Sequence, residues 1–247
     1  MRQLKGKTKE TNKQKKERKK EFLENKQRVF TIVLPTMAAI FVMIAVYVYI
    51  KTPKGTKYVT CGSVLKLMNI NYNVRLHSHD IKYSGGSGQQ SVTGTDIKED
   101  GSSYWLVKAE YGKQCTRGRP IKCGDIIRLE HTVTKKNLHS HLVSSPLSGK
   151  QEISAYGDYK GEGDSGDNWE LICQTDFWER EDMIMLKHVD THAYLAVSGK
   201  TYGNPLGQIE VIGDYSPSSR QVEWKTMEGL FIHPADFKAH HYEHTEL

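Results

Sequence analysis

Two His-x-His pairs are the most chemically suggestive feature of the chain: His77 with His79, and His139 with His141. In a β-strand this spacing places both imidazoles of a pair on one face, where they could ligate a metal ion. The corresponding segment further along the chain has no such pair, and no nearby Cys or Asp completes a defined set of ligands. We therefore expect the four histidines to hold turns or to line a ligand groove, and we expect no bound metal and no cofactor.

The chain contains four cysteines, which are Cys61, Cys115, Cys123 and Cys173. They form no Cys-x-x-Cys motif and no Cys/His zinc spacing, which disfavours redox catalysis and metal binding. We expect two disulfides, formed in an oxidising compartment. Cys115 and Cys123 would close the shortest loop, but Cys61 and Cys123 each open a similar Cys-Gly segment. All three connectivities are therefore left open.

Two loops resemble ligand-binding loops in composition only. Residues 84–88 lack the Gly-Lys-Ser/Thr ending of a phosphate-binding loop, and no helix is expected after them. Residues 161–168 lack the ligand spacing of a calcium loop. We interpret the first as a hairpin turn and the second as an acidic surface loop. Neither Gly-x-Ser-x-Gly nor His-Glu-x-x-His occurs, so the sequence favours a binding protein over an enzyme.

A threefold repeat organises the chain from about residue 57 onward. In each unit two short strands lead to a glycine-containing turn, a third β-rich segment and a tryptophan. The corresponding leucines Leu76, Leu138 and Leu195 are 62 and 57 residues apart. Three four-stranded units with this period predict an all-β chain folded as a β-trefoil, because the period is too long for a propeller blade. The core candidates are Leu67, Leu129, Leu186, Trp105, Trp169 and Trp224.

The N-terminus is strongly basic and is followed by an apolar segment. Residues 1–28 hold 12 Lys and Arg against 4 Asp and Glu, a net charge of +8, and their low apolar content predicts disorder or a solvated helix. Residues 29–50 are uncharged and would span about 33 Å as a helix, enough to cross a bilayer. The rest of the chain holds 23 Lys and Arg against 25 Asp and Glu, which disfavours nucleic-acid binding.

The charge distribution around the apolar segment predicts membrane topology. Because positive charge stays on the cytosolic side, we expect a single-pass type II protein whose repeats lie across the membrane. A cleaved signal peptide is the alternative and would give a soluble luminal form. We favour the anchor, because the apolar segment is longer than that of a typical signal peptide and runs directly into Lys51 without a small-x-small cleavage site.

The last four residues are expected to act as a retrieval signal. His244, Thr245, Glu246 and Leu247 differ at one position from the His-Asp-Glu-Leu signal for retrieval to the endoplasmic reticulum. The sequence therefore predicts residence in the endoplasmic reticulum. We divide the chain into a basic cytosolic tail, a transmembrane anchor, a linker, a trefoil and a C-terminal tail, at residues 1–28, 29–50, 51–56, 57–232 and 233–247.

Several motifs in a fixed order resemble those of one family. The Leu-His-Ser-His segments, the two Cys-Gly openings, the Ser-Pro-Leu-Ser-Gly turn at 145–149 and the Met-Glu-Gly-Leu-Phe ending at 227–231 are similar to those of MIR-repeat proteins. Among these proteins, the chain resembles the stromal-cell-derived factor two family over about residues 57–247. The resemblance implies a β-trefoil of three MIR repeats, without catalysis, that works in the lumen beside a J-domain co-chaperone and the chaperone BiP.

Two functional hypotheses follow from the resemblance and from the motif search. In the first, the protein is a non-enzymatic accessory of protein folding and quality control that binds the J-domain co-chaperone/BiP complex or unfolded clients. In the alternative, the trefoil binds glycans on O-mannosylated proteins, because MIR repeats also occur inside protein O-mannosyltransferases. A separate enzymatic activity ranks third, since those transferases resemble the chain only in the MIR part.

Overall fold

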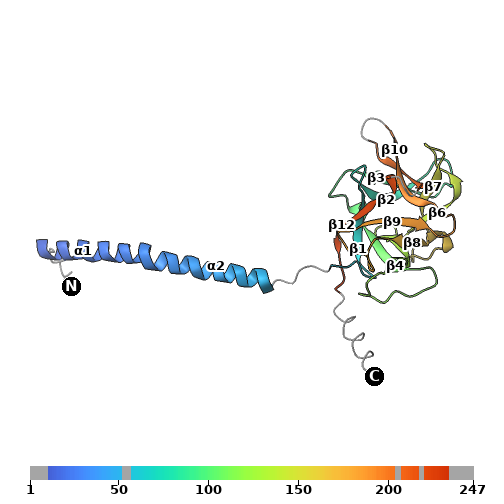
Figure 1. Ribbon diagram of the computed structural model, residues 1–247. Coiled ribbons are helices and arrows are strands. Elements are labelled where there is room, and N and C mark those ends of the chain that lie inside the picture. Colours follow the sequence, from blue (N-terminus) through green and yellow to red (C-terminus); the bar gives the residue numbers. More distant parts are fainter. Residues whose placement is uncertain (1–10, 52–56, 204–206, 217–219, 234–247) are drawn as a thin grey trace, which may run out of the picture. The chain divides into compact units, whose positions relative to one another are not determined.

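The structure is a computed structural model that describes residues 11–51, 57–203, 207–216 and 220–233. The chain divides into two compact units, Met1–Gly55 and Thr56–Leu247. The described part of the first unit is helical, and that of the second is built from β-strands (Figure 1).

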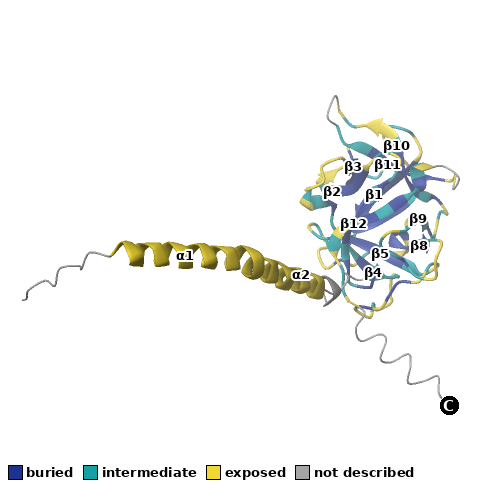
Figure 2. Ribbon diagram, turned by 60° about the vertical axis from the view of Figure 1, so that its left-hand side comes forward, coloured by how far each residue is buried: buried dark blue, intermediate teal, exposed yellow. Residues whose placement is uncertain are grey.

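The first unit is a helix with one irregular turn. α1 (Asn12–Arg28) leads into a π-helical turn, Val29–Val33, and then into α2 (Leu34–Lys51). Pro35 explains this turn, because it lacks the N–H that would bond the carbonyl of Thr31 and its ring crowds that carbonyl. Of the two states expected for the basic segment, α1 has the solvated helix, with all its side chains exposed (Figure 2).

The helical unit has the length and composition of a membrane span. Among the described residues, Asn12–Val48 forms one helix whose most apolar window has a mean hydropathy of 2.5. Large apolar side chains are exposed along it, including Phe30 at 60% and Phe41 at 72%. A helix that is apolar all round is stable in hydrocarbon, so α2 fits the transmembrane helix predicted for residues 29–50.

The described part of the second unit holds twelve strands. In chain order they are β1 (Val64–Asn69), β2 (Val74–Lys82), β3 (Gln90–Thr95), β4 (Trp105–Ala109), β5 (Ile126–His131), β6 (Asn137–Ser144), β7 (Gln151–Tyr156), β8 (Trp169–Ile172), β9 (Met183–His188), β10 (Tyr194–Thr201), β11 (Ile209–Asp214) and β12 (Trp224–Leu230).

The twelve strands form a closed barrel and a triangular cap. Strands β1, β4, β5, β8, β9 and β12 pair in a ring, each with two neighbours in the ring, so the barrel has no free edge. The hairpins β2–β3, β6–β7 and β10–β11 form the cap, where β3, β7 and β11 pair with one another. This is the β-trefoil predicted from the threefold repeat, and the prediction of fold class is confirmed.

The repeat is reproduced in the contacts of the core. The indole N–H groups of Trp105, Trp169 and Trp224 donate to the carbonyls of Leu76, Leu138 and Leu195, at 2.9, 2.9 and 2.8 Å. All six of these side chains are fully buried, as are the predicted core leucines of the barrel. Each tryptophan therefore fills the barrel with its ring and satisfies its one donor on the hairpin of its own repeat.

The structure has two disulfides, as the cysteine count predicts. Each joins the segment before the first strand of a repeat to the segment after its last strand. Cys61 pairs with Cys115 and Cys123 pairs with Cys173, at sequence separations of 54 and 50 residues. The local pairing of Cys115 with Cys123 is not formed. Instead, the loop before Cys123 folds back on the residue that opens the first repeat, where the Cys61 N–H donates to the Arg119 carbonyl at 2.9 Å.

The third repeat uses a different closure. Arg180 precedes the first strand of its repeat by three residues, as Cys61 and Cys123 do in theirs. Its guanidinium carbon lies 3.9 Å from the centre of the Phe231 ring. A cation–π contact thus stands where the other repeats have a disulfide, and it links the segment before β9 to the residue after β12, the first and last strands of the third repeat.

Candidate functional site

The two His-x-His pairs lie on the cap hairpins, one on β2 and one on β6. Both rings of each pair share a face of the strand, as the spacing predicts, and their centroids lie 4.9 Å apart in the first pair and 5.1 Å in the second. The inner histidines, His77 and His139, are buried, whereas the outer histidines, His79 and His141, are half-buried. Each pair therefore connects the trefoil interior to its surface.

Each inner histidine is hydrogen-bonded to a buried or half-buried carboxylate. The Nδ1 atom of His77 lies 2.7 Å from Asp100 Oδ2, and that of His139 lies 3.0 Å from Asp167 Oδ1. The carboxylates come from short 3-10 segments, since Asp100 precedes Gly101–Ser103 and Asp167 ends Ser165–Asp167. No Asp close to the histidines in sequence completes a ligand set, but the fold brings these two aspartates in from 23 and 28 residues away.

The segment 161–168 is not a simple acidic surface loop. Asp167 is fully buried in it, and its Oδ2 accepts from the Asn137 side chain at 3.2 Å and from the Asp164 N–H at 3.0 Å. Composition suggested exposure, but these donors and His139 make the burial of one carboxylate possible. The loop thus anchors the second histidine pair.

One group of side chains has atoms close enough to hold a cation. Nδ1 of His139 and carboxylate oxygens of Asp164 and Asp167 all lie within 4.8 Å of one another. Their hydrogen bonds are already made within the protein, since Asp164 Oδ1 accepts from the Gly166 N–H and Asp167 is bonded as described. These bonds give the cluster a structural role in fixing the loop.

The outer histidines face different surroundings. His79 lines a pocket of about 370 Å³ in the cap, together with Ile81, Tyr83, Pro146 and Tyr202 among others. His141 instead points its Nε2 atom at Glu152 of β7, at 3.5 Å from Oε1. The pocket has aromatic and aliphatic walls with a histidine at its rim, which suits a ligand with an apolar ring or side chain and a polar edge.

Burial shifts the proton affinities of these groups. The pKa values of His79 and His141 are lowered by partial burial and then by the neighbouring His77 and His139. Burial raises the pKa of Tyr202 to about 12. At neutral pH the outer histidines are therefore uncharged, and each offers a ring nitrogen as a hydrogen-bond acceptor.

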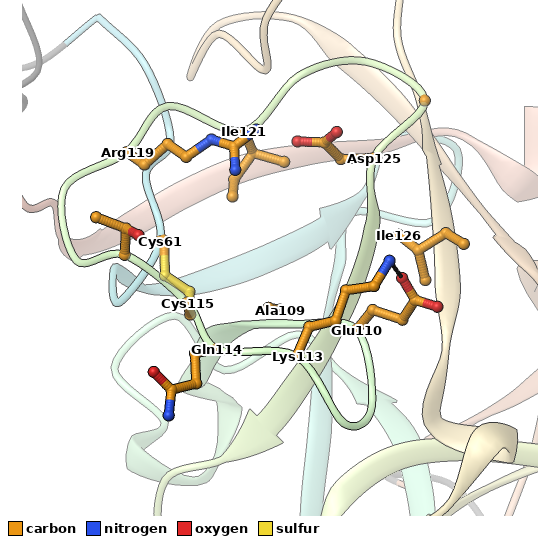
Figure 3. Close-up of a pocket in the computed structure, with 12 residues that line it drawn as sticks. Cys61, Ala109, Glu110, Lys113, Gln114, Cys115, Arg119, Ile121, Asp125 and Ile126 are labelled. Carbon is orange, nitrogen blue, oxygen red and sulfur yellow. Dashed lines mark ion pairs between the residues drawn. A yellow bond between two sulfur atoms is a disulfide. The ribbon is translucent and has the colours of Figure 1, made fainter.

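A second pocket lies beside the first disulfide, where sequence analysis indicated no site (Figure 3). It measures about 390 Å³ and includes Cys61, Cys115, Arg119 and Asp125 in its wall. An ion pair between Glu110 and Lys113 closes one side. The pocket is formed by loops that join different strands, so neither residue type nor spacing could have revealed it.

Of the other predicted site residues, the four cysteines are placed in the two disulfides, as described above. The retrieval residues 244–247 lie outside the described part of the chain. The four histidines form two separate pairs on different hairpins, and each pair has its own carboxylate.

The barrel, the cap and the threefold tryptophan contacts define a β-trefoil protein of the MIR class. The family model for the MIR domain matches residues 66–182, which hold the first two repeats. A second model, described as a domain of unknown function (DUF4519), matches residues 1–54. The chain belongs to the stromal cell-derived factor 2 family.

Known proteins support this assignment over the whole trefoil. Stromal cell-derived factor 2 of Bos taurus is 50% identical over 190 residues, which cover 76% of this chain and 89% of that protein. The crystal structure of the SDF2-like protein from Arabidopsis thaliana is 41% identical, with a TM-score of 0.68 over 71% of this chain and 98% of that one. A protein O-mannosyltransferase complex of S. cerevisiae, solved with its sugar donor, is 26% identical, with a TM-score of 0.63 over 72% of this chain and 27% of that one.

Proposed function

We propose that the protein is a non-enzymatic accessory of protein folding in the endoplasmic reticulum, which binds a J-domain co-chaperone with BiP or unfolded clients. The observation that carries the proposal is the likeness to stromal cell-derived factor 2 along the trefoil, at 50% identity over 190 residues. The C-terminal tetrapeptide and the paired cysteines support the same compartment.

The chemistry of the described site supports binding. The inner histidines are hydrogen-bonded to their aspartates, and the pocket at His79 has mainly apolar walls. Such a pocket suits contacts with chains that still expose apolar side chains. A membrane anchor would raise the local concentration of the trefoil near newly translocated protein.

Capture of partners tests the proposal. Tagged full-length protein is crosslinked mildly in cells, solubilised and purified, and the captured proteins are identified by mass spectrometry. We expect a J-domain co-chaperone and BiP to be enriched over a control bait that carries residues 1–56 alone, and we expect the purified complex to slow the aggregation of a denatured client. Equal recovery with both baits would contradict the proposal.

Topology and retrieval have their own test. We expect the protein to stay with membranes after carbonate extraction, because α2 is an uncleaved anchor in this proposal. Deletion of residues 244–247 is expected to move it outward along the secretory route, whereas deletion of 240–243, which keeps the final tetrapeptide, is not. A mature N-terminus beyond Ile50 would refute the anchor, and unchanged location of the first variant would assign retention to the anchor itself.

Glycan binding is the second candidate, favoured by the likeness to the S. cerevisiae O-mannosyltransferase complex. In this case the trefoil recognises O-mannosylated protein. Full-length protein in detergent micelles would then bind a mannosylated peptide but not the same peptide without sugar. Selective binding of this kind, with no co-chaperone among the captured proteins, would replace the first proposal by the second.

A further inference from the structure

We propose that Asp167, His139, His141 and Glu152 form a proton-binding chain that takes up one extra proton, and that this proton fixes the turn at residues 84–89 of the first repeat to β7 of the second. We call these four residues the second-repeat chain. The inference concerns regulation of the cap, and it does not depend on which partner the trefoil binds.

The second-repeat chain has three links between hydrogen-bonding atoms. Asp167 Oδ1 and His139 Nδ1 are 3.0 Å apart, and His139 Nε2 and His141 Nδ1 are 3.3 Å apart. The third link, from His141 Nε2 to Glu152 Oε1, is the longest at 3.5 Å. His141 Nε2 is buried and makes no hydrogen bond to any residue that the structure describes.

Counting protons shows that one link is incomplete when both histidines are neutral. A neutral imidazole carries one N–H, so the two rings supply two protons for the three links, and an ionised carboxylate supplies none. With the first two links made, the lone pair of His141 Nε2 faces a carboxylate oxygen. Two acceptors at this distance repel each other, and one added proton converts the contact into a charge-assisted hydrogen bond.

The first repeat provides an internal comparison. There the chain consists of Asp100, His77 and His79, with two links of 2.7 Å each. Two neutral rings complete both links, so this first-repeat chain needs no extra proton. The residue that corresponds to Glu152 in the strand register is Ser91, whose hydroxyl donates to the Ile81 carbonyl.

Glu152 contacts both His141 and the turn at residues 84–89. Its side chain is fully buried, and His141 is its one ion-pair partner among the described residues. Its two oxygens accept from the Ser87 hydroxyl and from the Ser87 N–H, the latter at 3.3 Å. Gly86 has φ of +62° and a Cβ there would overlap Glu152 Oε2, so the turn is built around this carboxylate.

The groups around His141 set when the proton binds. Partial burial and then His139 on the same strand lower the pKa of His141, whereas Glu152 on β7 and Asp164 beside the 3-10 segment raise it. Because the lowering causes dominate, the site is without its extra proton at neutral pH and gains it only as the pH falls below the ordinary pKa of an imidazole. A buried carboxylate gains from a positive partner, so the protonated chain holds Glu152 and the Ser87 turn more firmly.

The consequence reaches the cap pocket. The turn that Glu152 holds begins beside Tyr83 and Ser84, both of which line the pocket at His79. Acidification would therefore fix one wall of this pocket.

Hydrogen exchange followed by mass spectrometry tests the proposal on full-length protein in detergent micelles with a chelator. Exchange at the imidazole C2 position reports the titration of each histidine, and amide protection reports the turn. As the pH is lowered from about 7.5 through the titration of His141, we expect the protection factor of the Ser87 amide to rise about tenfold, the effect of one charge-assisted hydrogen bond. The rise should follow the titration of His141.

Glu152→Gln is the informative variant, because its amide donates to neutral His141 and completes the third link without a proton. We expect protection at Ser87 to become independent of pH in this variant and in His141→Asn. His79→Asn, in the first-repeat chain, is the matched control and should keep the rise. A rise that persists in Glu152→Gln, its loss in His79→Asn, or the same protection produced at neutral pH by added zinc would overturn the proposal.

Discussion

Replacement of both Cys123 and Cys173 by Ala is expected to lower the free energy of unfolding by about 4 kcal/mol. The disulfide closes a loop with a sequence separation of 50 residues, and in the chain-entropy model its removal restores that much freedom to the unfolded state. The bond also ties the segment before β5 to the end of β8, two neighbours in the closed barrel. The effect is therefore expected on the whole trefoil.

Denaturant unfolding of the full-length protein in detergent micelles, followed by tryptophan fluorescence, measures this loss. Trp105, Trp169 and Trp224 lie in the barrel core and report its unfolding. The matched variant replaces Cys61 and Cys115, whose separation of 54 residues predicts nearly the same loss. If either pair could be removed with less than about 1 kcal/mol of destabilisation, the entropic account of that disulfide would be wrong.

The fold was predictable because the repeat is visible in residue types. Leu76, Leu138 and Leu195 recur at nearly constant spacing. Together with the tryptophan of each repeat they are buried, so they mark the core positions of each unit. The third repeat lies beyond the residues matched by the MIR model, yet Trp224 donates to Leu195 as its counterparts do. The spacing of the core residues is therefore enough to predict the threefold topology.

The site was less predictable because its chemistry depends on pairs that are distant in sequence. The His-x-His spacing correctly indicated two rings on one face, but nothing in the sequence indicates Asp167 as the partner of His139 or Glu152 as that of His141. Those contacts depend on how the loop that holds Asp167 folds over β6 and on the register in which β6 pairs with β7. Disulfide pairing was open for the same reason, since Cys115 lies in an irregular loop whose path the repeat does not determine.

One position in the barrel holds different residue types in the three repeats but keeps equivalent hydrogen bonds. His131, His188 and Asn69 stand at its three copies. The side-chain nitrogens of all three lie 2.7 to 2.9 Å from the carbonyls of Ser102, Gly166 and Gln221. In each copy, a second side-chain atom accepts from the N–H of the residue three positions later. Asparagine therefore makes both bonds of a neutral histidine without being able to titrate.

The double variant His131→Asn, His188→Asn is accordingly expected to make the free energy of unfolding less dependent on pH in the acidic range. Burial lowers the pKa of His131 to about 4 and lowers that of His188. Both side chains titrate near 6.5 in the unfolded chain, so the unfolded state takes up protons first as the pH falls. The stability that comes from keeping these rings neutral is thus complete above about pH 6.5 and is lost as the pH falls toward 4, by about 3 kcal/mol for His131 alone.

Unfolding free energies of the wild type and the double variant, measured by denaturant titration from about pH 7.5 to about pH 4, separate this effect from packing. The histidine rings lie 5.1 and 4.9 Å from Trp105 and Trp169, so the smaller asparagines leave space and lower stability by about 1–2 kcal/mol per site at neutral pH. That cost is independent of pH, whereas the proton linkage appears as a slope in the plot of unfolding free energy against pH. A slope below pH 6.5 that is as steep in the double variant as in the wild type would assign acid sensitivity to other groups, with the half-buried His79 and His141 next in line because their pKa values are also lowered.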